Sequence, residues 1–309
     1  MILSVSRRTD IPAFYSEWFF NRIQEGYVCV RNPMNVHQVS RINLSPDLID
    51  CIVFWSKNPY PMLSRLDELS RYMYYFQFTI NPYDTVLEQY VPGKKHIIET
   101  FKRLSDKISP DRVIWRYDPI ILTDEISVDY HIRYFEEIAK RLHTYTKTCV
   151  ISFVDLYKKT EKNLKGTSSR EPNFSEMFNL AAHMALIASR YGMRVQTCAE
   201  KIELESVGIV HGHCIDSVLI EDLLGVKLVV SKDKNQRPEC GCVQSIDIGE
   251  YNTCAHNCKY CYANFNKEKV SLRYMQHNPK SPLLIGEIGV DDKVTERKIF
   301  SFISRDILF

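Results

Sequence analysis

Residues 149–200 contain the stretch that decides the fold, because a strand, a helix and a second strand follow one another there. Residues 149–155 read CVISFVD, a run of apolar residues that ends in Asp155. Residues 174–192 read FSEMFNLAAHMALIASRYG, with apolar residues three and four positions apart and Gly192 as a stop signal. Residues 194–200 read RVQTCAE, another short strand pattern. This order of elements predicts two parallel strands joined by a helix.

The same pattern recurs earlier in the chain. Short β-branched or aromatic runs lie at Ile2–Val5, Tyr27–Val30, Cys51–Trp55, Tyr74–Phe78 and Arg112–Trp115, and helical patterns lie at Phe14–Arg22, Ile97–Leu104 and Tyr130–Leu142. No Gly-x-Gly-x-x-Gly turn marks a dinucleotide crevice. We therefore expect an α/β fold, a complete or partial (β/α) barrel of parallel strands, rather than a doubly wound sheet. The polar stretch Lys158–Arg170 indicates a mobile loop.

Charged side chains follow most of these strand patterns directly. In a barrel, the residues after the carboxyl ends of the strands meet at one mouth, where such enzymes place their working groups. The candidates for catalytic or substrate-binding roles in that ring are Arg7, Arg8, Asp10, Lys57, Arg116, Asp118, Asp155 and Glu200. The ring suits a polar substrate, either a small molecule or a nucleotide-like one. Each member taken alone is equally explained as a capping or ion-pairing residue.

Composition and charge limit the class of protein. The 309 residues carry a formal net charge of +2, with 25% charged residues of both signs intermixed. No basic stripe for nucleic acid stands out, although folding can gather scattered lysines and arginines. The apolar run at the start is too short for a signal peptide, and no run approaches the about 20 residues of a spanning helix. We expect a soluble cytoplasmic protein with no membrane partner.

Ten cysteines in a chain for which we expect a reducing compartment favour metal sites over disulfides. Cys29, Cys51 and Cys149 lie in apolar strand patterns and are expected to be buried core residues. The other seven lie between residues 198 and 261. Three of them form the compact motif Cys254-Ala-His-Asn-Cys258-Lys-Tyr-Cys261. Three thiolates on so short a loop predict a [4Fe–4S] cluster with one iron left open.

This motif, with Tyr260 before the last cysteine and Tyr262-Ala-Asn264 after it, resembles the signature of radical S-adenosylmethionine enzymes. Its Tyr-Cys-Tyr-Ala form looks most like the spore photoproduct lyase branch, which repairs DNA lesions. The resemblance implies that Cys254, Cys258 and Cys261 hold the cluster and that Tyr260, Tyr262 and Asn264 help to hold S-adenosylmethionine. It also implies reductive cleavage of that cofactor to a 5′-deoxyadenosyl radical, with electrons from a flavodoxin or ferredoxin.

The position of the motif departs from that family, in which the loop follows the first barrel strand. The whole chain resembles a bacterial "domain of unknown function" family whose C-terminal cysteine cluster is similar to the radical enzymes' one. The matching stretches include Ser6-Arg-Arg-Thr-Asp-Ile-Pro12 and Val113-Ile-Trp-Arg-Tyr-Asp-Pro119. A circularly permuted barrel, with a short strand at Ser245–Ile248 before the loop, and an independent ferredoxin-like insertion both explain the displacement. We expect a barrel-like domain over residues 1–208 and a cysteine-rich iron–sulfur segment with a C-terminal tail over residues 209–309, packed on the barrel.

Four cysteines remain once the loop is assigned: Cys198, Cys214, Cys240 and Cys242. Four thiolates suit zinc or an auxiliary iron–sulfur cluster equally well. Isolated buried thiols explain them equally well, and one of them in the first cluster would close its open iron. His211, His213 and His256 are reserve ligands, although a loop histidine is more often a hydrogen-bonding residue.

Three classes of function fit these patterns. The first is a radical S-adenosylmethionine enzyme acting on an unknown polar substrate, with DNA photoproduct repair as a narrower form of it. The second is a non-catalytic zinc or iron–sulfur protein, including an electron-transfer protein. The third is a metal-independent barrel hydrolase working through Asp and Glu at the strand ends, which leaves the cysteine loop unexplained.

Overall fold

A computed structural model describes residues 1–304, without the side chains at positions 158 and 159, and centres on one eight-stranded sheet. All its neighbouring strands are parallel. In spatial order they are β10 (Ile246–Asp247), β1 (Ile2–Val5), β4 (Cys51–Ser56), β5 (Tyr74–Thr79), β6 (Val113–Ile120), β7 (Thr148–Phe153), β8 (Arg194–Cys198) and β9 (Val210–Gly212). The predicted α/β fold with a parallel sheet is confirmed. Within residues 1–304, β9 and β10 are the two edges and do not pair with each other, so the sheet is not a closed barrel.

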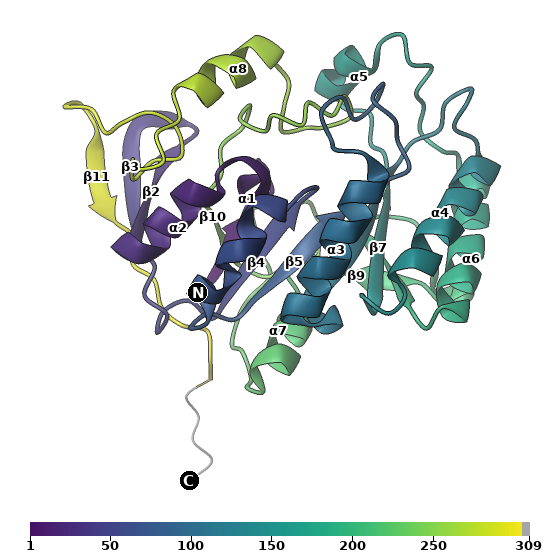
Figure 1. Cartoon of the computed structure of the whole chain (residues 1–309), viewed down its shortest axis with the longest axis horizontal. Coiled ribbons are helices and arrows are strands. Elements are labelled where there is room, and N and C mark those ends of the chain that lie inside the picture. The colour runs from purple at the N-terminus through teal and green to yellow at the C-terminus, as the bar shows by residue number, and fades with distance from the viewer. Residues whose placement is uncertain (305–309) are drawn as a thin grey trace.

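Helices cover one face of the sheet, as Figure 1 shows for α3. They are α1 (Ile11–Phe14), α2 (Ser16–Glu25), α3 (Lys94–Ile108), α4 (Val128–Leu142) and α6 (Phe174–Arg190), with the 3₁₀ segments η1 (Tyr60–Leu69), η2 (Pro110–Arg112) and η3 (Glu205–Val207). Their apolar stripes meet the sheet in one large core, where Trp115 of β6 stacks on Phe135 of α4 with ring centroids 4.8 Å apart. Burial of such aromatic side chains is the main force that holds the two layers together.

The opposite face of the sheet is filled only at its amino-terminal half. There α7 (Ser217–Leu224) and the residues that follow it pack on the sheet through Ile220 and Val243. The Tyr75 hydroxyl fixes this layer by donating to the carbonyl oxygen of Cys214 at 2.7 Å. Figure 1 shows α7 at one end of the sheet and α5 (Lys158–Leu164) and α8 (Lys267–Met275) at the other. At the carboxyl ends of the strands, polar side chains lie around a smaller apolar cluster that includes Tyr83, Ile121 and Tyr260.

A second, smaller sheet contains β2 (Tyr27–Asn32), β3 (Asn35–Asn43) and β11 (Lys293–Glu296). The expectation that Tyr27–Val30 joins the parallel sheet is wrong, because β2 pairs antiparallel with β3. A two-residue connection between β2 and β3 can only turn the chain back on itself, whereas a parallel crossover needs a dozen residues or more. Lys158–Arg170, expected as a loop, begins with the helix α5.

Two of the eight strands lie beyond residue 208. Both β9 and β10 pair with strands of the first 208 residues, β9 with β8 and β10 with β1. The strand expected at Ser245–Ile248 is present as β10, and the cysteine loop follows it directly. The division at residue 208 stays a prediction.

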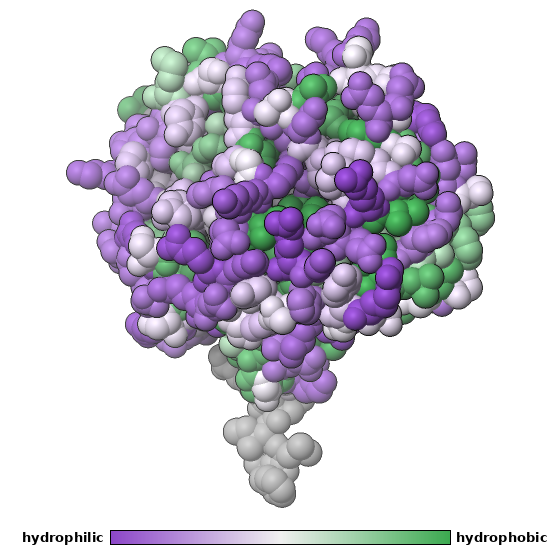
Figure 2. Space-filling view, turned by 45° about the vertical axis from the view of Figure 1, so that its right-hand side comes forward, coloured by the Kyte–Doolittle hydropathy of each residue, from purple (hydrophilic) through white to green (hydrophobic). Residues whose placement is uncertain are grey.

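The surface is mostly hydrophilic. Figure 2 shows one face on which apolar residues form separate patches among polar ones. Over residues 1–304, none of the helices combines the length and the apolar character needed to cross a bilayer.

The edge strand β10 is held to β1 by one carboxylate and one close backbone contact. Asp247 accepts hydrogen bonds from the hydroxyls of Ser4 and Ser6, at 2.6 and 2.7 Å, and from the backbone N–H of Arg7 at 2.9 Å. Two residues on, Gly249 approaches so closely that a Cβ atom there would lie 2.1 Å from the Ser6 hydroxyl oxygen. Only glycine fits this approach, and the residues after it are thereby aimed over the carboxyl ends of the strands.

We expect Gly249→Ala to lower the free energy of unfolding by about 2 kcal/mol, because the added methyl group must displace Ser6 and weaken its bond to Asp247. Urea unfolding followed by circular dichroism measures the loss. Gly93→Ala is the matched control, since a Cβ at Gly93 meets no atom within 4 Å. Equal effects of the two substitutions would show that the contact at Gly249 is not constraining.

Candidate functional site

The loop that carries Cys254, Cys258 and Cys261 lies against the connection after β5. The backbone N–H of Tyr90 donates to the carbonyl of His256 at 3.1 Å, and the N–H of Lys259 donates to that of Leu87 at 2.9 Å. Glu88 and Cys258 form an isolated antiparallel bridge. These main-chain bonds place the loop beside residues that follow β5.

The three thiols of this loop are well sheltered and not in contact with one another through hydrogen bonds. Cys258 is buried, and Cys254 and Cys261 are partly buried. Burial raises the pKa of all three thiols above the ordinary value. Backbone N–H groups of Ala263 and Asn264 point at the Cys261 sulfur, which is how loops that hold thiolates stabilise their charge.

Asp10 ties the loop to two neighbouring strand ends. Its buried carboxylate accepts from the Ser56 hydroxyl and from the Lys57 backbone N–H, both at 2.7 Å. On the other side it bonds Nε2 of His256 at 2.9 Å, and Phe14 packs edge-on against that imidazole. His256, a reserve ligand in the sequence analysis, is thus occupied as a hydrogen-bonding residue on this nitrogen.

A buried carboxylate, Glu88, holds two ammonium groups next to Cys258. Lys57 Nζ lies 2.8 Å from one oxygen and the Lys94 ammonium contacts the other. Burial opposes the charge of Glu88, but the two lysines outweigh it and lower its pKa to about 2. Burial likewise opposes the charge of Lys57, and Glu88 outweighs it and raises that pKa to about 12. Lys57 therefore remains a cation facing the Cys258 sulfur.

Tyr260 joins this pair to the centre of the sheet. Its hydroxyl donates to Glu88, and its ring lies 5.4 Å from the Lys57 nitrogen. Asn81, at the end of β5, bonds both the Tyr260 hydroxyl at 3.3 Å and the carbonyl of Asp118 at 2.8 Å. The network from the loop thus reaches the end of β6.

At that end, Arg116 and Asp118 form a buried ion pair. Two guanidinium nitrogens face the two carboxylate oxygens, with Nε 3.0 Å from Oδ1. Nη1 of Arg116 also lies 2.8 Å from the sulfur of Cys214. Asp118 is therefore placed between the loop network and the four cysteines outside the loop.

Those four cysteines, predicted to form a second metal site, come together. The sulfurs of Cys198 and Cys214 are 2.9 Å apart, and the thiol of Cys242 interacts with those of Cys214 and Cys240. They come from the end of β8, the residues after β9 and the segment before β10. None of them lies in the loop of Cys254–Cys261. Within the described residues, the one set of three or more ligand atoms all within 4.8 Å of one another is instead the partly exposed Glu203, Glu205 and His211.

The remaining predicted site residues are spread more widely. Arg7 extends between Asp233 and Asp247 towards Cys242, and Arg8 lies over the Tyr251 ring at 5.2 Å. Glu200 accepts from the Phe153 backbone N–H at 2.8 Å, and burial raises its pKa to about 7. Asp155 is exposed and forms an ion pair with Arg237. Half of Tyr262 is exposed, and its hydroxyl bonds the carbonyl of Arg7.

Several buried polar atoms around the loop have no hydrogen-bond partner. Over residues 1–304 seven such side-chain atoms occur, and five belong to the loop or to the strand ends beside it: Thr9 Oγ1, Asn58 Oδ1, Asn81 Oδ1, His256 Nδ1 and Asn264 Oδ1. An unpaired buried polar atom costs about 1–3 kcal/mol. Their concentration here is typical of a place that receives a polar ligand or water.

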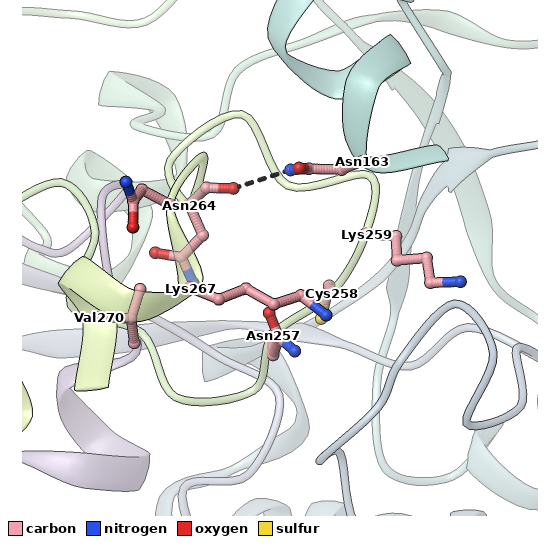
Figure 3. A pocket seen from close by; sticks show the side chains of 8 residues that line it. Asn163, Asn257, Cys258, Lys259, Asn264, Lys267 and Val270 are labelled. Atoms are coloured by element: carbon pink, nitrogen blue, oxygen red, sulfur yellow. Dashed lines mark hydrogen bonds between the residues drawn. The ribbon is translucent and has the colours of Figure 1, made fainter. Parts of the chain in front are cut away.

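A small pocket reaches Cys258 from the side of α8, as Figure 3 shows. Amide and amine side chains line most of it, including Asn257, Asn264 and Lys267. Asn163 of α5 closes one side by donating to the carbonyl of Asn264 at 3.1 Å. Polar groups thus lie on this side of the loop as well.

Sequence analysis missed Glu88 and Asp247. Glu88 lies in an irregular connection with no strand pattern immediately before it, and its partners Lys57 and Lys94 belong to other segments. Asp247 ends β10, a two-residue strand in a region without strand and helix alternation. Asp118 and Asp155 were selected because they are polar residues at the end of a strand pattern. The same criterion applied to the pattern Ser245–Ile248 selects Asp247.

Glu88→Gln is expected to lower the free energy of unfolding by about 3 kcal/mol, because it leaves two ammonium groups without their buried counter-charge. Thermal and urea unfolding measure the change. The control Glu68→Gln, which breaks the partly exposed pair with Arg65, is expected to cost about 0.5 kcal/mol. A loss at Glu88 no greater than the control would contradict the role of this ion pair.

Glu200 makes stability depend on pH. Its pKa rises from 4.5 to about 7 on folding, so the folded state binds the proton more tightly and loses stability as pH rises from 4.5 through 7. Glu200→Gln removes this loss. We expect the variant to exceed the parent by about 1–2 kcal/mol at pH 8 and to match it at pH 4.5, measured by urea unfolding at both pH values. A difference between variant and parent that does not change with pH would refute this, and Glu137→Gln on the surface of α4 is the control.

Comparisons with known proteins give the family but no activity. A family profile described as "Domain of unknown function (DUF1848)" matches residues 2–263, a range that includes both sets of cysteines. No curated protein matches the sequence. One solved structure, of a candidate alpha-L-fucosidase from Bacteroides thetaiotaomicron VPI-5482, is 14% identical and aligns over 59% of this chain and 84% of its own, with a TM-score of 0.27. So low a score carries no argument about fold or activity.

Proposed function

The chain belongs to the DUF1848 family, and for this member we propose an iron–sulfur enzyme that uses S-adenosylmethionine in radical chemistry on a polar substrate. The observation that carries the proposal is the position of the cysteine loop. It follows a parallel strand, β10, and lies beside the ends of β1, β4 and β5. A cluster there would face the charged groups at the strand ends, which is where a sheet of this kind presents its reactive residues.

The residues present fit a cluster with one open iron. Cys254, Cys258 and Cys261 are sheltered, and backbone N–H groups point at the sulfurs of Cys254 and Cys261. The other seven cysteines lie elsewhere: three are buried in the core, at positions 29, 51 and 149, and four form the separate set. None of these seven cysteines is proposed as a fourth ligand of the loop cluster. An open iron suits a cofactor that binds through amino and carboxylate groups.

When bound, the cluster and S-adenosylmethionine would supply a one-electron reduction that cleaves the cofactor's sulfonium, with the electron taken from a flavodoxin or ferredoxin. The chain's own residues bind, orient and shield. Lys57 and Arg116 are cations that could bind the carboxylate groups of the cofactor or substrate. Asp10 holds the cysteine loop in place through its hydrogen bond to His256. Tyr260 is buried beside Lys57 and Glu88, and Asn264 donates to the carbonyl of Cys254. The unpaired oxygens of Asn58 and Asn81 are acceptors for a ligand's N–H or O–H groups.

Glu200 is the candidate for moving a proton in this site, and Asp118 is a candidate for orienting a ligand. A carboxylic acid with a pKa of about 7 exchanges its proton readily near neutral pH, as Glu200 does. Asp118 is held by its ion pair with Arg116, so the pair has a fixed position from which to orient a ligand. The substrate implied is one with hydroxyl, amide or phosphate groups that this polar ring can hold, either a small molecule or a nucleotide-like one.

The pairing of β10 with β1 favours a permuted arrangement, and with it the enzymatic proposal, over an independent ferredoxin-like insertion. A strand added to the edge of the sheet, in the parallel sense and ahead of the loop, is what a permuted barrel requires. An inserted electron-transfer module would not need a strand before its loop to pair in parallel with β1. The alternative is a metal-binding protein that catalyses no reaction, and the following experiment distinguishes it from an enzyme.

Anaerobic reconstitution with iron and sulfide tests the proposal. We expect about four irons per chain in the loop cluster and, on reduction with S-adenosylmethionine present, release of 5′-deoxyadenosine measured by chromatography. Cys254→Ala, Cys258→Ala and Cys261→Ala are each expected to lower bound iron and 5′-deoxyadenosine at least tenfold.

Cys29→Ala is the matched control, because Cys29 is a core residue packed on Val39 and Leu283 away from the loop. It should leave both readouts unchanged. An intact cluster that releases no 5′-deoxyadenosine would remove the enzyme and leave the electron-transfer protein. Iron binding that survives all three loop substitutions would remove the cluster assignment itself.

A further inference from the structure

We propose that Cys198, Cys214, Cys240 and Cys242 bind one zinc ion through four thiolates, in a site separate from the iron–sulfur loop. The four side chains belong to three segments far apart in the sequence. The structure nevertheless brings their sulfurs into a continuous row in the order 198, 214, 242 and 240. Cys214, Cys240 and Cys242 are buried and Cys198 is partly buried. Four isolated core thiols would have no reason to meet in this way.

The spacing of the sulfurs favours a single ion over a second cubane. Four thiolates around zinc, with Zn–S bonds of about 2.3 Å, have their sulfurs about 3.8 Å apart. The sulfurs of Cys198 and Cys214 lie 2.9 Å apart, and the thiols of Cys242 and Cys240 continue the row. In the described structure no three of the four sulfurs lie within 4.8 Å of one another, so the row must fold back on itself to surround an ion. In a cubane each thiolate binds a different iron, so every contact in the row would have to open. The loop of Cys254–Cys261 differs in this respect, since none of its sulfurs is hydrogen-bonded to another within the described structure.

The surroundings supply the charge that such a site needs. Zinc with four thiolates carries two net negative charges, which must be compensated when buried. Arg116 donates to the Cys214 sulfur at 2.8 Å, and the Arg7 guanidinium lies close to Cys242. The backbone N–H of Ile215 donates to the Cys242 sulfur at 3.4 Å. Hydrogen bonds of this kind orient and stabilise metal-bound thiolates.

At two glycines near the four thiols, the backbone lies so close to neighbouring residues that a Cβ atom would clash with them. A Cβ at Gly241, between Cys240 and Cys242, would lie 1.8 Å from Nδ1 of His213, so the two cysteines can flank that ring only through glycine. A Cβ at Gly212, two residues before Cys214, would lie 2.8 Å from Cβ of Gln196. These contacts bring the residues after β9 and the segment before β10 onto the end of β8. Zinc there would add to the pairing of β8 with β9 and to the bond from the Val243 N–H to the Ile215 carbonyl.

The competing state of the same thiols is a disulfide between Cys198 and Cys214. Their sulfurs lie 2.9 Å apart, well beyond the about 2.05 Å of an S–S bond. A disulfide would also leave Cys240 and Cys242 without a partner. Zinc uses all four.

The test uses the full chain with the triple change Cys254→Ala, Cys258→Ala and Cys261→Ala, so that its outcome does not depend on the loop cluster. The protein is made with zinc in the medium, dialysed against a weak chelator, and its metals are counted by mass spectrometry. We expect about one zinc per chain, falling at least tenfold when Cys198→Ser and Cys240→Ser are added. Replacement of the zinc by cobalt should give the intense visible bands of tetrahedral cobalt bound to sulfur.

A second measurement avoids the risk that the serine variants fold poorly. A mercurial thiol reagent added stepwise to the folded triple variant should release one zinc, detected with a chelating dye, in proportion to modification of four thiols. Zinc-free protein with four freely reactive thiols would overturn the proposal, as would a Cys198–Cys214 disulfide found by mass spectrometry. Iron and sulfide in place of zinc would overturn it as well. Loss of 5′-deoxyadenosine production in the unmodified protein bears only on the loop.

Discussion

The parallel pairing of β10 with β1 is the constraint on which the site depends. A strand of two residues contributes little pairing energy of its own, so the Asp247 carboxylate supplies the attachment, with two serine hydroxyls and one backbone N–H as donors. Gly249 then lets the chain turn closely past Ser6. This junction sets where residues 250–264 start over the strand ends, and their bonds to Asp10 and to the segment around Glu88 fix the rest of the loop.

Buried charge holds the rest of the site in place. Two ion pairs, Glu88 with its lysines and Arg116 with Asp118, lie at neighbouring strand ends and are joined through Tyr260 and Asn81. Each charged group is expensive to bury and is tolerated because its partner is fixed by the sheet. The arrangement therefore positions cations beside both groups of sulfur atoms while keeping the hydrogen-bonding atoms of Asn58 and Asn81 free for a ligand.

Much of this architecture was predictable from the sequence, and the failures have physical reasons. Six of the seven strand patterns form strands of the parallel sheet because buried parallel strands are continuous apolar runs, as in Cys149–Phe153. Tyr27–Val30 has the same composition but is turned back by the short connection to β3, which composition does not reveal. The open edges of the sheet are β9, which is too short to give a pattern, and β10, whose pattern at Ser245–Ile248 does not reveal that it pairs with β1.

Charged site residues at the ends of strands could be predicted from the sequence, whereas charged site residues in irregular loops could not. Asp10, Lys57, Arg116 and Asp118 follow apolar runs and were selected for that reason, whereas Glu88 takes its importance from lysines on other segments. The four cysteines outside the loop were grouped by elimination, and the structure brings them together. Asp155 shows the limit of the rule, because it ends a strand pattern and yet faces solvent with Arg237.

The order of the strands in space also has a consequence for assembly. The ribosome makes β1 first among the eight and β10 last, yet the two are neighbours. A nascent chain of 240 residues would have a nearly complete sheet with one bare edge and no loop to receive iron. Delivery of the proposed cluster would therefore wait until almost the whole polypeptide has emerged, which would make metal loading a late event in maturation.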